Sequence, residues 1–262
     1  MCNNLKRVFL AVVAGLILYC PASGWGREGH ETIAKIAENH LRPSARRKIE
    51  KYLGNRSIVY YAKWMDDYRR TPEYKFTNYW HQAPVNEELE YADSLLHPTR
   101  WNAVHALEQA IAALEDYKEL PDSAVAVNLK YIIHIVGDMH CPAHVTYTTY
   151  NQRYDVYMPG SDNPVYVHHI WDTHIIRATR WFSATEWAAE IDRISRKEAA
   201  GIVSGTPRDW FDDTAERCVV QFEWAKPGQR LDQDFLNKAI PLIETQLLYA
   251  GYRLASLLNE LF

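Results

Sequence analysis

Two pairs of residues in this chain share a spacing of four positions: His134 with Asp138, and His168 with Asp172. Because residues four apart lie on one face of an α-helix, each spacing predicts a histidine and a carboxylate that point the same way. Imidazole nitrogen and carboxylate oxygen are common zinc ligands. A single pair is more often a histidine with an incidental acid nearby. Two pairs, with His144 a short loop after the first, favour a metal site.

Apolar residues recur at helical spacing along most of the chain. No internal repeat, low-complexity linker or hinge rich in glycine and serine interrupts this pattern. We therefore predict an all-α fold, a single compact helical domain whose loops complete a site. The expected elements are an apolar helical repeat at 33–41, helices over 99–114, 123–138, 183–194, 206–225 and 234–261, and a small hairpin of 156–158 with 165–167.

The first 24 residues have the pattern of a secretory signal peptide, with two basic residues, a short apolar run, and small residues at Ala22 and Gly24. A membrane anchor is the alternative, but a spanning helix needs about 20 apolar residues. Cleavage after Gly24 would leave 25–262 as the mature domain, secreted or periplasmic and without a membrane anchor. Trp25 would then carry a free α-amino group.

The charge balance limits the partners of this domain. The chain has 29 basic and 33 acidic residues, a formal charge of −4, which becomes −6 when Lys6 and Arg7 leave with the signal peptide. A basic footprint for duplex nucleic acid is therefore absent, and an anionic substrate must be attracted locally. Two cysteines follow the signal, Cys141 and Cys218. In an oxidising compartment they could form a disulfide, or both could stay reduced and buried.

Further motifs place histidine or aspartate beside tryptophan: Trp25-Gly-x-x-Gly-His30, Trp64-x-Asp66-x-x-Arg69 and Trp80-His81. Together with His134-Ile-Val-Gly-Asp138-Met-His140-Cys-Pro-Ala-His144 and His168-x-Ile-Trp171-Asp172, they form an ordered set that resembles the S1/P1 nuclease family. Its members are secreted, trinuclear-zinc endonucleases specific for single strands, with 3′-nucleotidase activity. Their all-helical fold is shared with bacterial zinc phospholipases C. The resemblance covers nearly the whole mature chain.

This resemblance implies that the chain binds three Zn²⁺ ions. The first zinc would be held by Asp66, His81, His134 and Asp138; the second by the amino nitrogen and carbonyl oxygen of Trp25, with His30 and the shared Asp138; the third by His144, His168 and Asp172. An α-amino group has a reference pKa near 8, so zinc can displace its proton at modest cost near neutral pH.

The resemblance also implies the reaction and the substrates. Metal-activated hydroxide would hydrolyse single-stranded DNA and RNA to 5′-phosphate products, and 3′-nucleotides would be substrates too, with the protein acting as a monomer. Asp66 and Asp138 would act as catalytic ligands. Arg69 would neutralise charge at the reacting phosphate, because a guanidinium can bind two phosphate oxygens at once. Its alternative is a solvated helix cation beside Arg70. We assign His140 to packing or hydrogen bonding behind the metal ligands.

Two segments depart from the family pattern. Gln82-Ala83-Pro84 follows His81 where members commonly have an aromatic and then an acidic residue near the bound base, and Tyr166-Val167 replaces asparagine-leucine before His168. The aromatic run 147–151 is therefore the first place to look for base stacking. Two other functions stay open: a phospholipase C-like phosphodiesterase, and a secreted zinc-binding protein without turnover. The opening tryptophan motif and an aspartate at 172 favour the nuclease.

Overall fold

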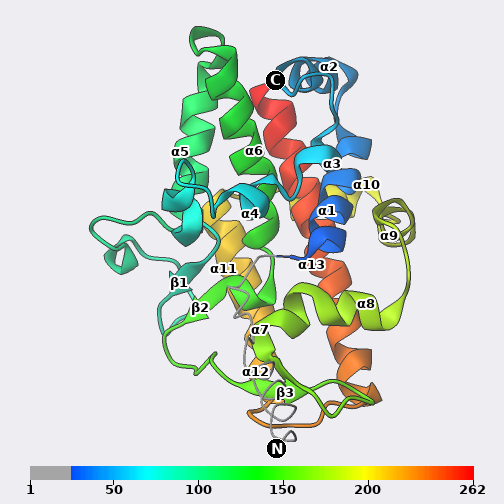
Figure 1. Ribbon diagram of the computed structural model, residues 1–262. Helices are drawn as coiled ribbons and strands as arrows, with labels where there is room; N and C mark the ends of the chain where they lie inside the picture. Colours follow the sequence, from blue (N-terminus) through cyan, green and yellow to red (C-terminus); the bar gives the residue numbers. More distant parts are fainter. Residues whose placement is uncertain (1–24) are drawn as a thin grey trace, which may run out of the picture.

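Helix α6 (Asp122–Asp138) runs through the middle of the molecule in the computed structural model, which describes residues 25–262 (Figure 1). It packs between α5 (Ala103–Glu115) and α13 (Gln233–Leu261) and also contacts α1 (Arg27–His40). The all-α prediction is therefore confirmed. The predicted signal peptide, residues 1–24, lies outside the described residues.

The remaining elements surround this central layer. The other α-helices are α2 (Pro43–Tyr52), α3 (Ile58–Tyr61), α4 (Trp64–Tyr68), α7 (Val167–His169), α8 (Ile175–Thr179), α9 (Ala184–Ile191), α10 (Arg196–Ile202), α11 (Pro207–Cys218) and α12 (Gln221–Trp224). Short 3₁₀ segments are η1 (Lys75–Tyr79), η2 (Asp93–Leu95), η3 (Tyr117–Glu119) and η4 (Pro142–His144), and η5 (Ile170–His174) is a π-helical turn. Within residues 25–262, four strands of three residues each complete the fold: β1 (Ala83–Val85), β2 (Val145–Tyr147), β3 (Asp155–Tyr157) and β4 (Pro164–Tyr166).

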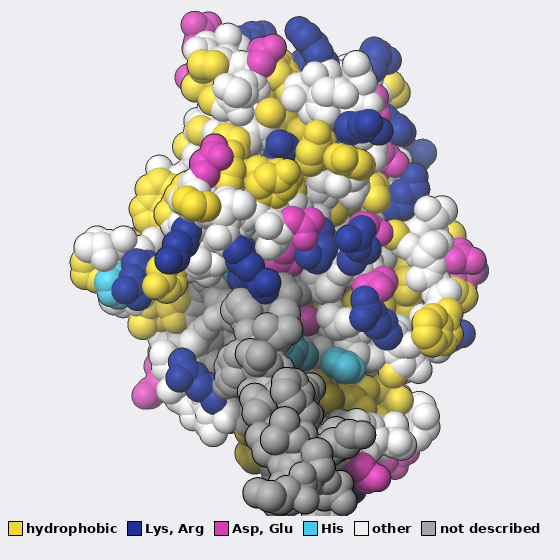
Figure 2. Space-filling view, viewed as in Figure 1, with side chains coloured by type: hydrophobic (Ala, Val, Ile, Leu, Met, Phe, Trp, Pro, Cys, Tyr) yellow, Lys and Arg dark blue, Asp and Glu magenta, His cyan; other side chains and the backbone are white. Residues whose placement is uncertain are grey.

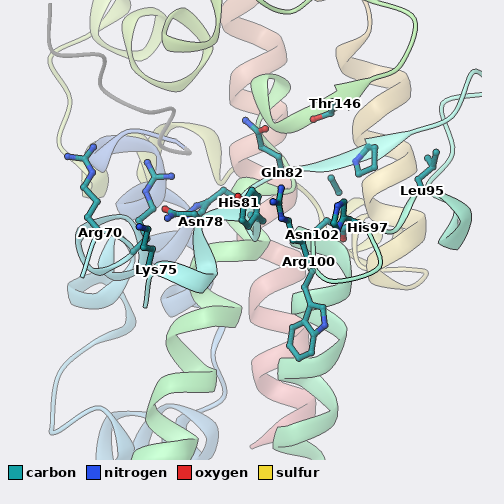
Figure 3. Close-up of a pocket in the computed structure, with 15 residues that line it drawn as sticks. Arg70, Lys75, Asn78, His81, Gln82, Leu95, His97, Arg100, Asn102 and Thr146 are labelled. Carbon is teal, nitrogen blue, oxygen red and sulfur yellow. The ribbon is translucent and has the colours of Figure 1, made fainter. Parts of the chain in front are cut away.

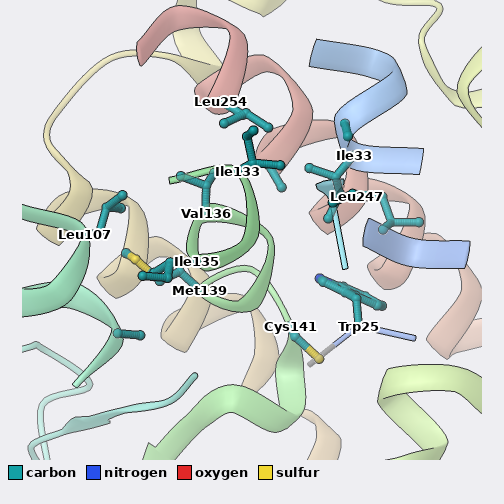
Figure 4. Close-up of a cluster of buried hydrophobic side chains, with 14 of the residues drawn as sticks. Trp25, Ile33, Leu107, Ile133, Ile135, Val136, Met139, Cys141, Leu247 and Leu254 are labelled. Carbon is teal, nitrogen blue, oxygen red and sulfur yellow. The ribbon is translucent and has the colours of Figure 1, made fainter. Parts of the chain in front are cut away.

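The last two turns of α6 are buried on every side. All eight residues from Tyr131 to Asp138 are buried, and an α-helix enclosed in this way belongs to the interior of a domain. Figure 4 shows Ile133 and Val136 of this helix beside Leu254 of α13, with Trp25 at the edge of the same cluster. Burying each large aliphatic side chain contributes about 1.5–3 kcal/mol. Because this helix is packed on every side, its polar side chains His134 and Asp138 are also buried in the core.

Polar side chains begin several helices near the predicted positions. Ser183 caps the N-terminus of α9 with a reciprocal pair of hydrogen bonds to Glu186, and Thr206 caps α11 in the same way with Asp209. Asn102, and not Thr99, caps α5, because its side chain accepts a hydrogen bond from an amide in the first turn.

The ends of the helices differ from the predictions. Helix α9 ends at Ile191, before the predicted 194, and the predicted helix 206–225 is divided into α11 and α12. Pro241 lies inside α13, which continues through it as one helix. A run of apolar spacing does not show where a chain turns, so these ends were less predictable than the capped beginnings.

Two pairs of short strands hold the loops around the site. The predicted hairpin is present as the antiparallel pair β3–β4, each strand beginning one residue earlier than expected. A parallel pair, β1–β2, was not predicted; its register places Ala83 opposite Val145. Because these residues follow His81 and His144 closely, the pair brings two predicted ligands from distant parts of the chain to one place.

Both cysteines of the described chain are free and buried, so residues 25–262 contain no disulfide between Cys141 and Cys218. Within the same residues, no helix is both long and apolar enough to cross a membrane.

Candidate metal centre

All eight predicted histidine and aspartate ligands are buried, and none is more than 7 % exposed. They come from six separate segments of the chain. Two groups of ligand atoms, each within 4.8 Å, share His134: His30 with Asp66 and His134, and His81 with His134 and Asp138. His144 and Asp172 belong to a third group, and Nε2 of His168 lies 3.1 Å from Oδ2 of Asp172. The side chains are His30, Asp66, His81, His134, Asp138, His144, His168 and Asp172. The structure thus brings the whole predicted set together.

Asp138 lies at the centre of this arrangement. Its Oδ2 is 2.7 Å from Nδ1 of His81 and 3.1 Å from Nε2 of His134. Its Oδ1 is 3.3 Å from Nε2 of His30 and 3.4 Å from Nδ1 of His144. One carboxylate therefore faces imidazoles on both of its oxygens, which is the position expected of a ligand shared between two ions.

Asp66 approaches the same imidazoles from α4. Its Oδ1 lies 3.9 Å from Nδ1 of His81 and 4.0 Å from Nε2 of His134. The ligand atoms of Asp66, His30 and His134 form one of the compact groups. Because α4 packs on α6, a short helix near residue 66 can complete a cluster that α6 begins.

A third group forms around Asp172. Its Oδ2 is 3.1 Å from Nε2 of His168, and its Oδ1 is 3.7 Å from Nε2 of His144. The two imidazole centroids are 5.0 Å apart. Asp172 lies in the π-helical turn η5 instead of the α-helix that the spacing predicted, yet it still meets His168. Single π-helical turns occur often at functional sites.

Main-chain carbonyls fix the orientation of two of the rings. Nδ1 of His134 is 2.8 Å from the carbonyl oxygen of Ala62, and Nδ1 of His144 is 2.5 Å from that of His81. Because a carbonyl oxygen only accepts, the ring proton lies on Nδ1 in both cases. Nε2 is then left with its lone pair directed into the cluster, as metal-ligating histidines require.

Glycine allows the closest approaches in the centre. A Cβ at Gly137 would lie 2.8 Å from Nδ1 of His30, and a Cβ at Gly29 would lie 2.8 Å from Cβ of Trp25. Real Cβ atoms do not tolerate such contacts, so both positions require a residue without a side chain. His30 can therefore stack on His134, with centroids 4.0 Å apart and planes inclined by 18°.

Trp25 is fully buried. The amide of Gly26, the next residue, donates a hydrogen bond of 2.7 Å to the main-chain oxygen of Asp172. The start of the described chain is thereby attached to the segment that carries His168 and Asp172.

Burial and mutual attraction set the charges of the centre. Burial lowers the pKa of His30, and lowers that of His144 to about 3, so both rings are neutral. Burial opposes ionisation of Asp138, but attraction to His134 outweighs it and holds the pKa of that carboxyl well below its usual range. The same attraction outweighs burial at His134 and raises its pKa. The central carboxylate is ionised and attracts positive charge.

Many of the potential ligand atoms are buried without a hydrogen bond. Among residues 25–262, nine such atoms on seven of the eight side chains have no hydrogen-bond partner, including both oxygens of Asp66 and both ring nitrogens of His30. An unsatisfied buried polar atom costs about 1–3 kcal/mol. These nitrogen and oxygen atoms point to one place and are all possible metal ligands. They fit a metal centre, because bound metal ions would satisfy them together.

The sequence reasoning missed one residue of the third group. Sγ of Cys141 donates a hydrogen bond of 3.3 Å to Oδ1 of Asp172 and lies within 4.8 Å of ligand atoms of His144 and Asp172. Its place between Asp138 and His144 in the sequence was the available signal. His140, by contrast, turns away from the cluster, as expected for a packing residue.

His140 connects α6 to α13 through a hydrogen bond with Arg253. Its Nδ1 donates to the main-chain oxygen of Val136 at 2.7 Å, and its Nε2 accepts from Arg253 of α13 at 2.8 Å. Burial, together with the charge of Arg253, lowers the pKa of His140 to about 3. Arg253 also donates to Asp213 of α11. This connection holds the end of α6 at which the ligands lie.

A cleft of about 940 Å³ opens beside the centre and is lined by Arg69 and His81. Nε of Arg69 is 3.5 Å from Oδ1 of Asp66, and the side chain is buried, so the solvated-cation alternative is not what the structure has. In Figure 3, His81 lies between Arg70 and Lys75 on one side and His97 and Arg100 on the other. Figure 2 shows basic side chains around the middle of this face, where histidines reach the surface.

Comparison with known proteins agrees with this geometry. The chain is 26% identical to Nuclease S1 of Aspergillus oryzae, over 97% of this chain and 98% of that protein. It is 25% identical to Endonuclease 2 of Arabidopsis thaliana (99% and 98%) and 26% identical to Nuclease P1 of Penicillium citrinum (90% and 97%). The S1/P1 Nuclease family matches residues 25–262. The chain therefore belongs to the S1/P1 nuclease family.

Proposed function

We propose that this protein is a secreted or periplasmic trinuclear-zinc nuclease that hydrolyses single-stranded DNA and RNA and removes the phosphate of 3′-nucleotides. The observation that carries the proposal is the set of buried, unpartnered ligand atoms that converge around Asp138 and Asp172. Family membership supports the reaction class, since the relatives are named nucleases and endonucleases. We infer a monomer that acts after removal of residues 1–24.

Three zinc ions would use the residues of the cluster as follows. Asp66, His81, His134 and Asp138 would hold one; Trp25, His30 and Asp138 a second; His144, His168 and Asp172 a third. Bound zinc supplies Lewis acidity and a nucleophilic hydroxide at neutral pH. The shared carboxylate of Asp138 would reduce the repulsion between two neighbouring cations.

The protein's own residues bind and orient the phosphate. Arg69 lies at the boundary between the cluster and the cleft, so its guanidinium can donate to phosphate oxygens while the adjacent Asp66 keeps it in place. A buried guanidinium stabilises negative charge that develops on the phosphate, because low polarity strengthens the interaction. Asp66, Arg69 and Asp138 are the residues to which we assign the catalytic role.

The proposal is tested by assaying the purified mature protein, residues 25–262, on four substrates in parallel. Single-stranded DNA, RNA and 3′-AMP should be hydrolysed, and phosphatidylcholine should not. Cleavage of phosphatidylcholine alone would mean a phospholipase C-like enzyme. Zinc binding without turnover of any substrate would mean a metal-binding protein, and either result would overturn the proposed function.

A further inference from the structure

One wall of the cleft beside the metal centre is aromatic and is formed by residues that are not predicted metal ligands. Trp101 lines it and is 43 % exposed, although tryptophan is normally buried. Its ring stacks on the buried Trp80, with centroids 5.3 Å apart and planes inclined by 19°. Because Trp80 directly precedes His81, this stack fixes the exposed ring relative to the metal centre.

A second flat group lies on the same wall. Tyr79 is 50 % exposed, and the guanidinium of Arg100 lies 4.5 Å from its ring centroid. The end of η1 and the loop before α5 are therefore joined at the cleft by two ring contacts, Trp80 with Trp101 and Tyr79 with Arg100. Rings that are already held in place lose little entropy when a nucleobase stacks on them, and such stacking does not depend on base identity.

The charge of the cleft is opposite to that of the chain. Four cationic side chains line it, namely Arg69, Arg70, Lys75 and Arg100, and no aspartate or glutamate is found among the described residues that line it. The whole chain has a formal charge of −4. A polyanion would therefore be attracted to this cleft and not to the surface as a whole.

We propose that this wall is a subsite for the nucleotide next to the reacting phosphate, with Trp101 stacking its base and Lys75 contacting the strand's phosphates. This subsite rests on the proposed function, and it would make the protein prefer single strands to a duplex. In Figure 3, Lys75 and Arg100 lie on opposite sides of His81. A strand along the cleft would thus pass the metal centre between them. A duplex keeps its base faces stacked and cannot use this wall.

The stacking contact is tested with Trp101→Ala in the zinc-loaded mature protein. Binding of a labelled phosphorothioate single strand of thymidines, followed by fluorescence polarisation, should weaken about tenfold, as expected for loss of one stacked base. Zinc content and the KM for 3′-AMP should not change. The matched control is Trp181→Ala, because Trp181 is 98 % exposed and lies outside the cleft.

The phosphate contact is tested by the salt dependence of the same binding. Lys75→Ala should reduce the slope of log affinity against log salt by about 0.7, the value for one contact to a single strand. Lys226→Ala removes an exposed lysine outside the cleft and should leave the slope unchanged.

The outcomes separate this inference from the proposed function. Strand affinity in Trp101→Ala equal to that of Trp181→Ala would overturn the subsite, even if the wild-type protein is an active nuclease. An equal loss for the strand and for 3′-AMP would overturn it too, because Trp101 would then serve the reacting nucleotide. If the wild-type protein cleaves no nucleic acid, the proposed function fails, and the binding measurements still decide whether this wall holds a strand.

Discussion

Nε2 of His30 and Oδ1 of Asp138 lie 3.3 Å apart, yet neither atom has a hydrogen-bond partner within the described part of the chain. The two residues belong to α1 and α6, which pack directly on each other. Two buried polar atoms held face to face in this way leave a cost that a bound cation would remove. This relationship supports Asp138 as a ligand shared between two metal ions.

Asp138→Ala should remove both zinc ions that share this carboxylate and leave the one at His144, His168 and Asp172. Elemental analysis of the purified variant should find about one zinc per chain, because a structural carboxylate ligand to two ions has no substitute. Asp67→Ala is the control, since Asp67 is 52 % exposed and pairs with Lys63 away from the cluster. Three retained zinc ions in Asp138→Ala would exclude the shared ligand.

Gly137→Ala should weaken zinc binding without unfolding the protein. The added methyl group would lie 2.8 Å from Nδ1 of His30 and push that ring from its place. We expect affinity for the metal to fall by about 10–100-fold, the usual effect of disturbing the support of a metal ligand. Gly201→Ala is the control, because nothing lies within 4 Å of its Cβ position. Chelator competition measures both variants, and equal affinities would contradict the steric argument.

A residue retained before Trp25 should abolish activity and lower the zinc content. The reason is that the second zinc would require the free amino nitrogen of Trp25, which an additional peptide bond converts into an amide. Mature protein beginning at Trp25 and protein beginning at Gly24 are compared by elemental analysis and by hydrolysis of single-stranded DNA. Equal activity of the two forms would exclude the terminal amine as a ligand.

Cys141→Ala should loosen the third metal site more than Cys141→Ser. Serine keeps a donor for the carboxylate of Asp172, whereas alanine removes the hydrogen bond that the thiol makes at 3.3 Å. We expect about tenfold faster zinc loss to a chelator in the alanine variant, in line with the effect of other groups that orient metal ligands. Identical rates in both variants would show that the thiol does not position Asp172.

Ligands within one helical turn were predictable from the sequence, and contacts between distant segments were not. The spacing of His134 and Asp138 determines their common face, whatever the rest of the chain does. By contrast, the parallel pairing of β1 with β2 joins segments far apart in the sequence, and only the folded chain places His144 Nδ1 against the carbonyl of His81. Local patterns contain no information on such pairings.

The aromatic residues that line the cleft could not be predicted from the sequence either. The aromatic run 147–151 follows a predicted ligand, so sequence reasoning favoured it for base stacking. In the structure Tyr147 is buried, and the ring of Tyr150 is stacked on Phe222 with centroids 4.2 Å apart and planes inclined by 2°. Neither residue lines the cleft, whereas Tyr79 and Trp101 do. Which aromatic residues face a cleft depends on tertiary packing and cannot be read from their number or proximity to a ligand.

We propose that eight buried side chains and one new terminus assemble a three-metal hydrolytic centre. Anomalous diffraction at the zinc edge, from crystals of the mature protein purified with zinc, would locate the ions. Three peaks are expected, two of them beside Asp138 and one between His144, His168 and Asp172. A map without peaks at these residues, or with zinc only at surface histidines, would rule out the three-metal centre.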